Sequence, residues 1–271
     1  MGATEILRDG DVGGALAQLL KEVRGDPSSA RLRTFLFQLS AVAGDWDRAA
    51  AQLAVVGQLD AKSLPMVQTY RAALECEALR RAVFAGGKTP LLFGDPEEWV
   101  ALLLEALRLS ALGKFAEAAQ TRARAFDAAP ASAGTLDGKA FAWLADCDPR
   151  FGPIFEAVIN GKYYWLPCHR LQKIEFDAPV DLRDSVWMPA TLTLRNGGQT
   201  VALMPTRYPG SEASADDLVR LARKTDWLEV ADGSFHGVGQ RMLASDEGEY
   251  PIMDVRVIEF LPLAADSGAA A

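Results

Sequence analysis

The residues whose chemistry most suggests an enzyme lie in one stretch near the middle of the chain. Asp146 and Asp148 flank Cys147, and Cys168 and His169 follow further along. Carboxylates and imidazole rings bind divalent metals, and a thiol beside an imidazole can act as a nucleophile with its base. One hypothesis for the function is therefore a metal-dependent hydrolase, or another enzyme, centred on Asp146, Asp148 and His169.

The sequence around the two aspartates favours a structural role instead. The chain has only 2 histidines, and no second pair of carboxylates at helical spacing lies beside the aspartates. Asp148 precedes Pro149, an arrangement that is common in turns, and either aspartate could cap the next helix. If so, Asp148→Ala lowers the free energy of unfolding by about 0.5 to 2 kcal/mol, the range for a lost helix cap.

The adjacent residues Cys168 and His169 form a poor catalytic pair. Neighbouring side chains on a strand point to opposite faces, so the thiol and the imidazole do not meet. The glycine-rich string Gly233–Gly239 lacks the Lys-Ser/Thr pair and the following helix of a phosphate-binding loop. We interpret it as a strand with glycines at a bend. These patterns lead us to expect no enzyme activity, no catalytic residue, no metal site and no cofactor.

Arginines near aromatic rings form a second group of residues, and their chemistry suits binding. They either hold loops through structural ion pairs or form a recognition surface, because arginine and aromatic side chains anchor protein interfaces. The second interpretation makes five residues candidates for partner binding: Arg183, Trp187, Arg207, Tyr208 and Arg241. Both interpretations predict binding rather than catalysis.

Composition and charge exclude several classes of protein. Of the 271 residues 49% are hydrophobic, enough for one large domain or two of ordinary size. The net charge of -8, with acidic and basic residues interspersed, argues against nucleic-acid binding. No apolar run approaches the roughly 20 residues that span a bilayer, so we expect no membrane insertion. The 3 cysteines, in a sequence that does not start with a secretory leader, indicate reduced thiols and a cytoplasmic protein.

The first half of the chain carries a repeat typical of paired helices. Three segments each contain a glycine, a polar residue, an apolar residue and then an alanine: Gly10–Ala15, Gly44–Ala49 and Gly113–Ala118. The alanines of the first two segments are 34 residues apart, which is the tetratricopeptide period. Between the second and third segments, Ser63 and Gly86 bound a predicted helix over Leu64–Phe84, and Asp95–Glu98 is typical of a further helix start.

Stacked helix pairs leave a concave face that can hold a helix or an extended peptide. If the repeat register is regular, Thr34 and Gln38 of the second unit line this face with Leu103 and Leu107 of the third. The alternative is that both leucines are ordinary core residues, because apolar residues of helices usually lie inside.

The second half has the patterns of a mixed α+β domain. We predict short helices over 139–145 and 154–159 and a longer one over Ala215–Lys224, with Asn196-Gly197 in a hairpin turn. The predicted strands are Tyr163–Leu166, Leu171–Phe176, Met188–Leu194, Thr200–Met204, Trp227–Val230, Gly237–Leu243 and Val255–Phe260. Such elements suggest a partly open barrel or a small antiparallel-rich sheet.

The domain organisation follows from these two patterns. The sequence predicts a multidomain α and α+β protein, with a tetratricopeptide-like helical domain over residues 1–132, a mixed domain over 133–265 and a flexible tail over 266–271. The stretch Phe141–Pro167 reads as the joint between the two domains. Its apolar side chains, expected to pack the helices onto the mixed domain, are Phe141, Trp143, Leu144, Phe151 and Ile154.

An ordered series of motifs resembles one known family. The motifs are Asp95–Trp99, Trp143–Pro153, Gly161–Pro167, Asp181–Trp187, Pro205–Gly210, Arg223–Trp227 and Gly237–Arg241. They are similar to the successive motifs of the ImpE, SciE or TagJ family, accessory proteins of bacterial type VI secretion. The series covers most of the chain.

The resemblance implies a non-enzymatic cytoplasmic adaptor with tetratricopeptide-like helices and a distinct carboxy-terminal domain. The implied partner is the small contractile-sheath subunit of the TssB or VipA type, bound through its amino-terminal helix. An indirect link to the ClpV ATPase, which handles the sheath, is also implied. Which face binds the sheath helix does not follow from the resemblance.

Overall fold

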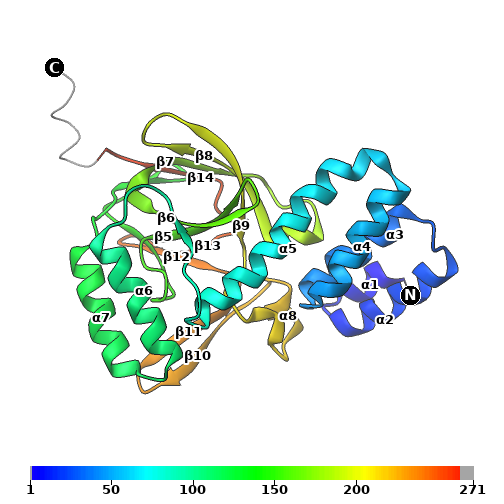
Figure 1. Cartoon of the computed structure of the whole chain (residues 1–271), viewed down its shortest axis with the longest axis horizontal. Helices are drawn as coiled ribbons and strands as arrows, with labels where there is room; N and C mark the ends of the chain where they lie inside the picture. The colour runs from blue at the N-terminus through cyan, green and yellow to red at the C-terminus, as the bar shows by residue number, and fades with distance from the viewer. Residues whose placement is uncertain (1, 263–271) are drawn as a thin grey trace.

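A computed structural model describes residues 2–262 of the chain; the predicted tail over 266–271 lies outside them. Helices fill the first half and strands most of the second half (Figure 1). The helices of the first half are α1 (Ala3–Arg8), α2 (Val12–Gly25), α3 (Ala30–Val42), α4 (Trp46–Leu59), α5 (Leu64–Phe84), α6 (Glu98–Ala111) and α7 (Phe115–Ala128), with a 3-10 turn η1 (Ala61–Ser63) before α5. No helix within residues 2–262 is long and apolar enough to cross a membrane.

The repeated glycine motif marks the turns between successive helices. Gly10 and Gly44 have positive φ angles of 93° and 76°, a conformation that glycine adopts without steric cost. The aspartate after each glycine caps the next helix: the Asp11 carboxylate accepts a hydrogen bond from Gly14 N, and the Asp45 carboxylate accepts one from Arg48 N. The repeated residues therefore have a structural role: the glycine ends one helix and the aspartate caps the start of the next.

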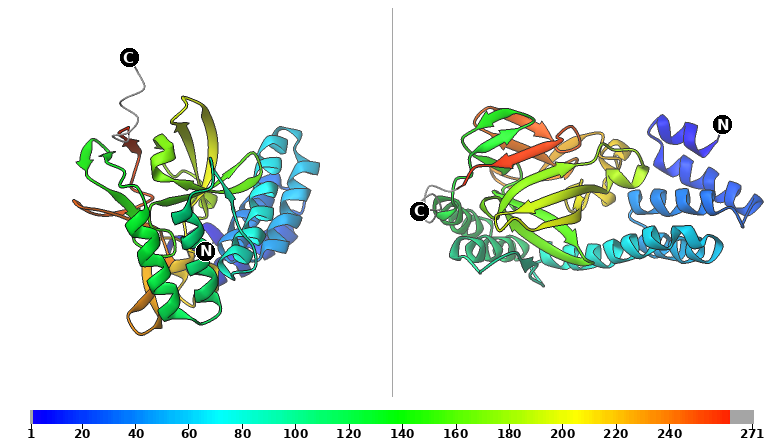
Figure 2. Two further views of the ribbon diagram at one scale, coloured as in Figure 1. Left: turned by 60° about the vertical axis from the view of Figure 1, so that its left-hand side comes forward. Right: turned by 90° about the horizontal axis from the view of Figure 1, so that it is seen from above.

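The helices do not form one continuous stack. Helices α1 to α4 pack against one another at one end of the molecule, and α6 and α7 form a hairpin at the other end (Figures 1 and 2). The long helix α5 runs between these two groups and lies against the sheet. The tetratricopeptide-like assignment stays a prediction.

Within residues 2–262, the strands form one large sheet and two small ones. The large sheet has nine strands in the order β1-β6-β5-β9-β8-β7-β14-β2-β3, and every pair except β1 with β6 is antiparallel. Its members are β1 (Leu91–Leu92), β2 (Gly134–Leu136), β3 (Lys139–Phe141), β5 (Ile154–Ile159), β6 (Lys162–Pro167), β7 (Leu171–Phe176), β8 (Trp187–Leu194), β9 (Gln199–Pro205) and β14 (Val257–Phe260). The small sheets comprise β4 (Leu144–Asp146), β12 (Met242–Ser245) and β13 (Gly248–Pro251), and the hairpin of β10 (Thr225–Ala231) with β11 (Ser234–Gly239). The predicted antiparallel-rich sheet is confirmed, and its two edges, β1 and β3, do not close into a barrel.

Two of the predicted helices are wrong, and a third is shorter than predicted. Residues 139–145 form β3 and part of β4, and residues 154–159 form β5. Every residue of β5 is buried, because β6 and β9 flank it and both faces are covered, so it lacks the alternation that identifies a half-buried strand. The predicted helix over Ala215–Lys224 is reduced to α8 (Asp217–Arg220), which ends before Ala222, whose φ angle is 54°.

Helices and sheet share a hydrophobic core. Trp187 of β8 lies 5.9 Å from the ring of Tyr70 of α5 and 6.1 Å from that of Trp46 of α4. Further along α5, Phe84 packs 5.1 Å from Phe151. The joint predicted at Phe141–Pro167 receives α5 through Phe151, but the prediction is wrong for three of its residues: Phe141 and Leu144 lie in a separate core of the sheets, and Trp143 is 41% exposed. The division at residue 132 stays a prediction; β1, which precedes it, joins the large sheet.

The glycine-rich string forms β11 and the turn before it, and Gly239 is one of two glycines in it with little room for a side chain. A Cβ on Gly239 would lie 2.0 Å from the carbonyl oxygen of Lys224, whereas a Cβ on Gly233 would meet no atom within 4 Å. Both have positive φ angles, 89° and 67°. We expect Gly239→Ala to lower the free energy of unfolding by about 1 to 3 kcal/mol more than Gly233→Ala, because only the first adds crowding to backbone strain. Urea unfolding of both variants measures the difference, and equal losses would contradict the close approach.

Candidate functional site

Charged side chains are concentrated where α5 meets the sheets. They come from α5, from β4 and the turn after it, from β5, and from the segments after β9 and β11, and each is less than 9% exposed. The members of this buried charge network are Glu77, Arg80, Asp146, Asp148, Arg150, Glu156, Arg207 and Arg241. Buried charges are costly unless they are paired, so their partners decide what the network can do.

Glu156 is the centre of the network. Its two carboxylate oxygens accept hydrogen bonds of 2.7 and 2.8 Å from Arg80 and one of 3.0 Å from Arg241. The hydroxyl of Tyr163 donates a further hydrogen bond to the same carboxylate. Burial alone would raise the pKa of Glu156, but the charge and hydrogen bonds of Arg80 lower it overall. Glu156 is therefore an ionised group shared by two arginines, one from α5 and one from the strand region.

The two aspartates of the enzyme hypothesis lie in this network and already have protein partners. Asp146 accepts hydrogen bonds of 2.7 and 2.9 Å from Arg241 and one of 2.8 Å from the Tyr208 hydroxyl. Burial raises the pKa of Asp146 to about 6, and the charge of Asp148 adds to the rise. Asp148 holds Arg150 through both carboxylate oxygens and also accepts a hydrogen bond of 2.8 Å from the Arg150 backbone N–H. That backbone bond makes Asp148 a turn residue, as predicted, but the helix that it was expected to cap is strand β5.

His169 does not join the two aspartates. Its Nε2 lies 2.9 Å from Glu97, which Arg170 also binds, and its ring packs 6.2 Å from Trp99. Burial alone would raise the pKa of Glu97, but hydrogen bonds from Trp99 and Arg170 lower it overall. Within residues 2–262, no group of three or more His, Cys, Asp or Glu side chains is arranged to hold a metal ion.

Cys168 and His169 lie in a 3-10 turn, η2 (Cys168–Arg170), and not on a strand as assumed. The Cys168 thiol nevertheless faces the Leu144 carbonyl oxygen at 3.9 Å, away from the Glu97 partner of His169. Burial raises the pKa of the Cys168 thiol, and burial also raises the pKa of Cys147 to about 12. These thiols are therefore protonated at neutral pH, which opposes a role as nucleophile.

The predicted recognition surface of arginines and aromatics is wrong for four of its five residues. Trp187, Arg207, Tyr208 and Arg241 are at most 3% exposed, and the alternative of structural ion pairs and hydrogen bonds describes them. Arg207, for example, donates to the Val42 and Ala41 carbonyl oxygens at the carboxyl end of α3, where the helix dipole favours a cation. Only Arg183 is partly exposed; it lies 4.7 Å from the Tyr70 ring and pairs with Asp181.

The predicted concave face is divided by the tertiary structure. Leu103 and Leu107 are 1% and 4% exposed in α6, so they are core residues. Thr34 and Gln38 of α3 instead line a separate cavity of about 610 Å³, at the other end of the molecule (Figure 1). We call it the α1–α3 groove; its lining residues come from α1, α3, η1 and η3 (Leu182–Ser185), and include Leu7, Phe35, Asp60, Asp181 and Leu182.

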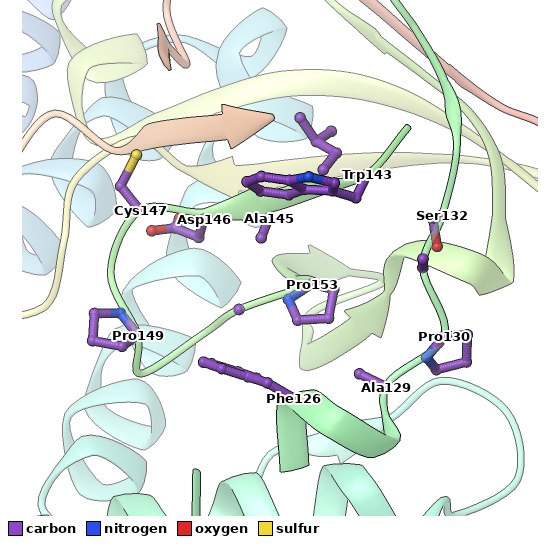
Figure 3. A pocket seen from close by; sticks show the side chains of 13 residues that line it. Phe126, Ala129, Pro130, Ser132, Trp143, Ala145, Asp146, Cys147, Pro149 and Pro153 are labelled. Atoms are coloured by element: carbon purple, nitrogen blue, oxygen red, sulfur yellow. The ribbon is translucent and has the colours of Figure 1, made fainter. Parts of the chain in front are cut away.

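Sequence reasoning missed a second open surface, between α7 and the small sheets. Two cavities of about 360 and 560 Å³ share Phe126, Cys147 and Pro149 in their linings, and so adjoin each other. Figure 3 shows the first, with Trp143 above the strand of Ala145 and Phe126 on the opposite wall. We call the two together the α7 groove. The exposure of Trp143 could not be predicted from the sequence, because large aromatic residues usually lie in the core.

The chain is similar in sequence to a protein family and to one of its relatives, and similar in fold to a solved structure. A family model described as "ImpE protein" matches residues 138–259. The chain is 53% identical over 262 residues to "Type VI secretion system accessory component TagJ" of Pseudomonas aeruginosa, covering 97% of this chain and 92% of that protein. The crystal structure of protein VPA1032 from Vibrio parahaemolyticus has a similar fold, with a TM-score of 0.88 and 24% identity over 97% of this chain and 98% of that one.

Proposed function

Because the chain belongs to the ImpE family, which includes TagJ, we propose that it is an accessory component of a type VI secretion system and acts in the cytoplasm by binding other proteins. The observation that carries this proposal is the 53% identity to TagJ over nearly the whole chain. Coverage of this extent includes both the helices and the sheets, so it is a likeness of the complete arrangement.

The buried charge network supports an adaptor more than an enzyme. Glu156, Asp146 and Asp148 each hold at least one arginine, and the neighbouring Tyr163 and Tyr208 hydroxyls are also engaged. An enzyme needs groups that are free to bind a substrate or exchange a proton. In this chain Glu156 binds Arg80 and so joins α5 to the large sheet, while Asp146 and Asp148 bind arginines of the strand region.

We propose the α1–α3 groove as the site for the amino-terminal helix of the small sheath subunit, of the TssB or VipA type. An amphipathic helix binds a groove through apolar anchors on one face and polar contacts at the rim. The groove offers the half-buried Phe35 and Leu182 as apolar surface, with the Thr34 side chain beside them; Leu7 and Gln38 also line it but are only 6% and 7% exposed. A link to the ClpV ATPase would then be indirect, through the bound sheath subunit.

Co-purification with the sheath subunit tests this proposal. We expect recovery of the full-length subunit and loss of recovery when its first helix is deleted. Phe35→Glu places a charge in the groove and should reduce recovery at least about tenfold, since a buried unpaired charge is costly. Val201→Glu serves as the matched control, because Val201 of β9 is 69% exposed, and it should leave recovery unchanged. Equal recovery with and without the first helix would contradict the proposal.

A further inference from the structure

The α7 groove combines apolar walls with an arginine, Arg122, whose Nε makes no hydrogen bond. Phe126 and Trp143 are 36% and 41% exposed on the walls of its smaller cavity. The larger cavity is lined by Phe235, which is 44% exposed, and by Arg122 of α7. Exposed aromatic side chains gathered in one concavity are typical of protein-binding surfaces.

Arg122 lacks the partners that the other half-buried or buried arginines of the region have. Its Nε is buried and makes no hydrogen bond, and the one hydrogen bond that its side chain makes among residues 2–262 is a 3.3 Å contact to Ser110 Oγ. The nearby carboxylate of Asp148 is occupied by Arg150 and by the Gly237 N–H. Burial lowers the pKa of Arg122, and the charge of the nearby Asp148 offsets only part of that shift.

Charge complementarity therefore indicates what the groove binds. We infer that the α7 groove is a second docking site, for a peptide segment of a partner protein that carries a carboxylate beside an aromatic or leucine side chain. The carboxylate would pair with Arg122, and the apolar side chain would enter the smaller cavity beside Phe126 and Trp143. Glu249, the acidic residue that lines the larger cavity, is exposed and can remain in water.

The α7 groove lies far from the α1–α3 groove. Helix α7 and the α1–α3 groove lie at opposite ends of the molecule, separated by α5 (Figures 1 and 2). A segment in the α7 groove would therefore not compete with a helix in the α1–α3 groove. The chain could bring two partners together, and the second site does not depend on the identity of the first.

Two blocked tripeptides test the inference: acetyl-Leu-Glu-Phe-amide and its glutamine counterpart. The indole N–H signals of Trp143 and Trp227, which line the two cavities, report on binding by NMR and are assigned with Trp→Phe variants. We expect saturable shifts with the glutamate peptide and about tenfold weaker binding of the glutamine peptide, the effect of one charged hydrogen bond in a partly buried site.

Variants of α7 separate the charge from the apolar contact. Arg122→Gln should make the two peptides bind equally, and Phe126→Ala should weaken both by the same factor. Arg124→Gln, an exposed arginine of the same helix, is the matched control and should preserve the difference. Three results would overturn the inference: no saturable shift, equal affinities for the unaltered protein, or shifts of the same indoles with protein concentration alone, which would indicate a second copy as the occupant.

Discussion

Glu156→Gln is expected to lower the free energy of unfolding by about 3 to 5 kcal/mol, the range for breaking a buried ion pair by removing one partner. The substitution keeps the shape of the side chain and removes its charge. Arg80 and Arg241, which are 5% and 0% exposed, then lack the Glu156 carboxylate that they share. An amide also presents a donor where one arginine needs an acceptor.

Urea unfolding followed by circular dichroism measures this loss. Glu175→Gln on β7 is the control, because Glu175 pairs with Lys173 at 2.9 Å where the two side chains are 45% and 31% exposed. Solvent screens such a pair, so its loss should be small. If Glu156→Gln costs no more than the control, Glu156 does not hold the network together.

Asp148→Ala is expected to cost about 3 to 5 kcal/mol, more than the 0.5 to 2 kcal/mol of an ordinary cap. The turn contact to the Arg150 backbone is present, but Asp148 is also 0% exposed and pairs with the Arg150 side chain. It further accepts a hydrogen bond of 2.7 Å from the Gly237 N–H of β11. Removing the carboxylate leaves a buried guanidinium and a buried N–H without this partner.

Asp45→Ala provides the comparison, because Asp45 is a helix cap on the partly exposed surface of α4. We expect it to cost about 0.5 to 2 kcal/mol. The double variant Asp148→Ala/Arg150→Met should recover part of the loss, since it removes the uncompensated charge as well. If Asp148→Ala and Asp45→Ala lower the free energy of unfolding equally, Asp148 acts only as a turn residue and its buried ion pair adds no stability.

The two substitutions probe one structural role of the network. Arg80 of α5 binds Glu156 of β5, and Glu77 of the same helix accepts a hydrogen bond of 2.9 Å from the Trp187 indole of β8. These contacts join residues far apart in the chain and fix where α5 lies on the sheet. Because α5 separates the α1–α3 groove from the α7 groove, loss of the network should also disturb their relative placement.

Local chemistry was readable from the sequence wherever neighbouring residues decide the outcome. The Gly-Asp turns at Gly10 and Gly44, the helix over Leu64–Phe84 and the hairpin at Asn196-Gly197 all depend on φ angles and caps supplied within a few residues. The turn role of Asp148 is of the same kind. The family resemblance also came from sequence, because ordered motifs are a property of the chain itself.

Contacts between distant segments were decided only by the tertiary structure. Strand β5 resembles a short helix in sequence because burial on both faces removes its alternation, and that burial comes from β6, β9 and α5. Arg241 and Tyr208 have the composition of an interface, yet their partner Asp146 lies in a segment far away in sequence. Whether an arginine is a surface anchor or a buried ion depends on these distant partners, which no local pattern encodes.

The same reason explains the candidate sites. From sequence alone, Asp146, Asp148 and His169 remained a possible cluster, and Thr34 and Leu103 remained possible neighbours. In the fold, His169 contacts Glu97, Leu103 is buried and Thr34 lines the α1–α3 groove. The turns, the family and the positions of the charged residues follow from local sequence patterns. Which charges are enclosed and which surfaces stay open depends on how α5 packs between the two groups of helices, because burial is a property of the whole fold.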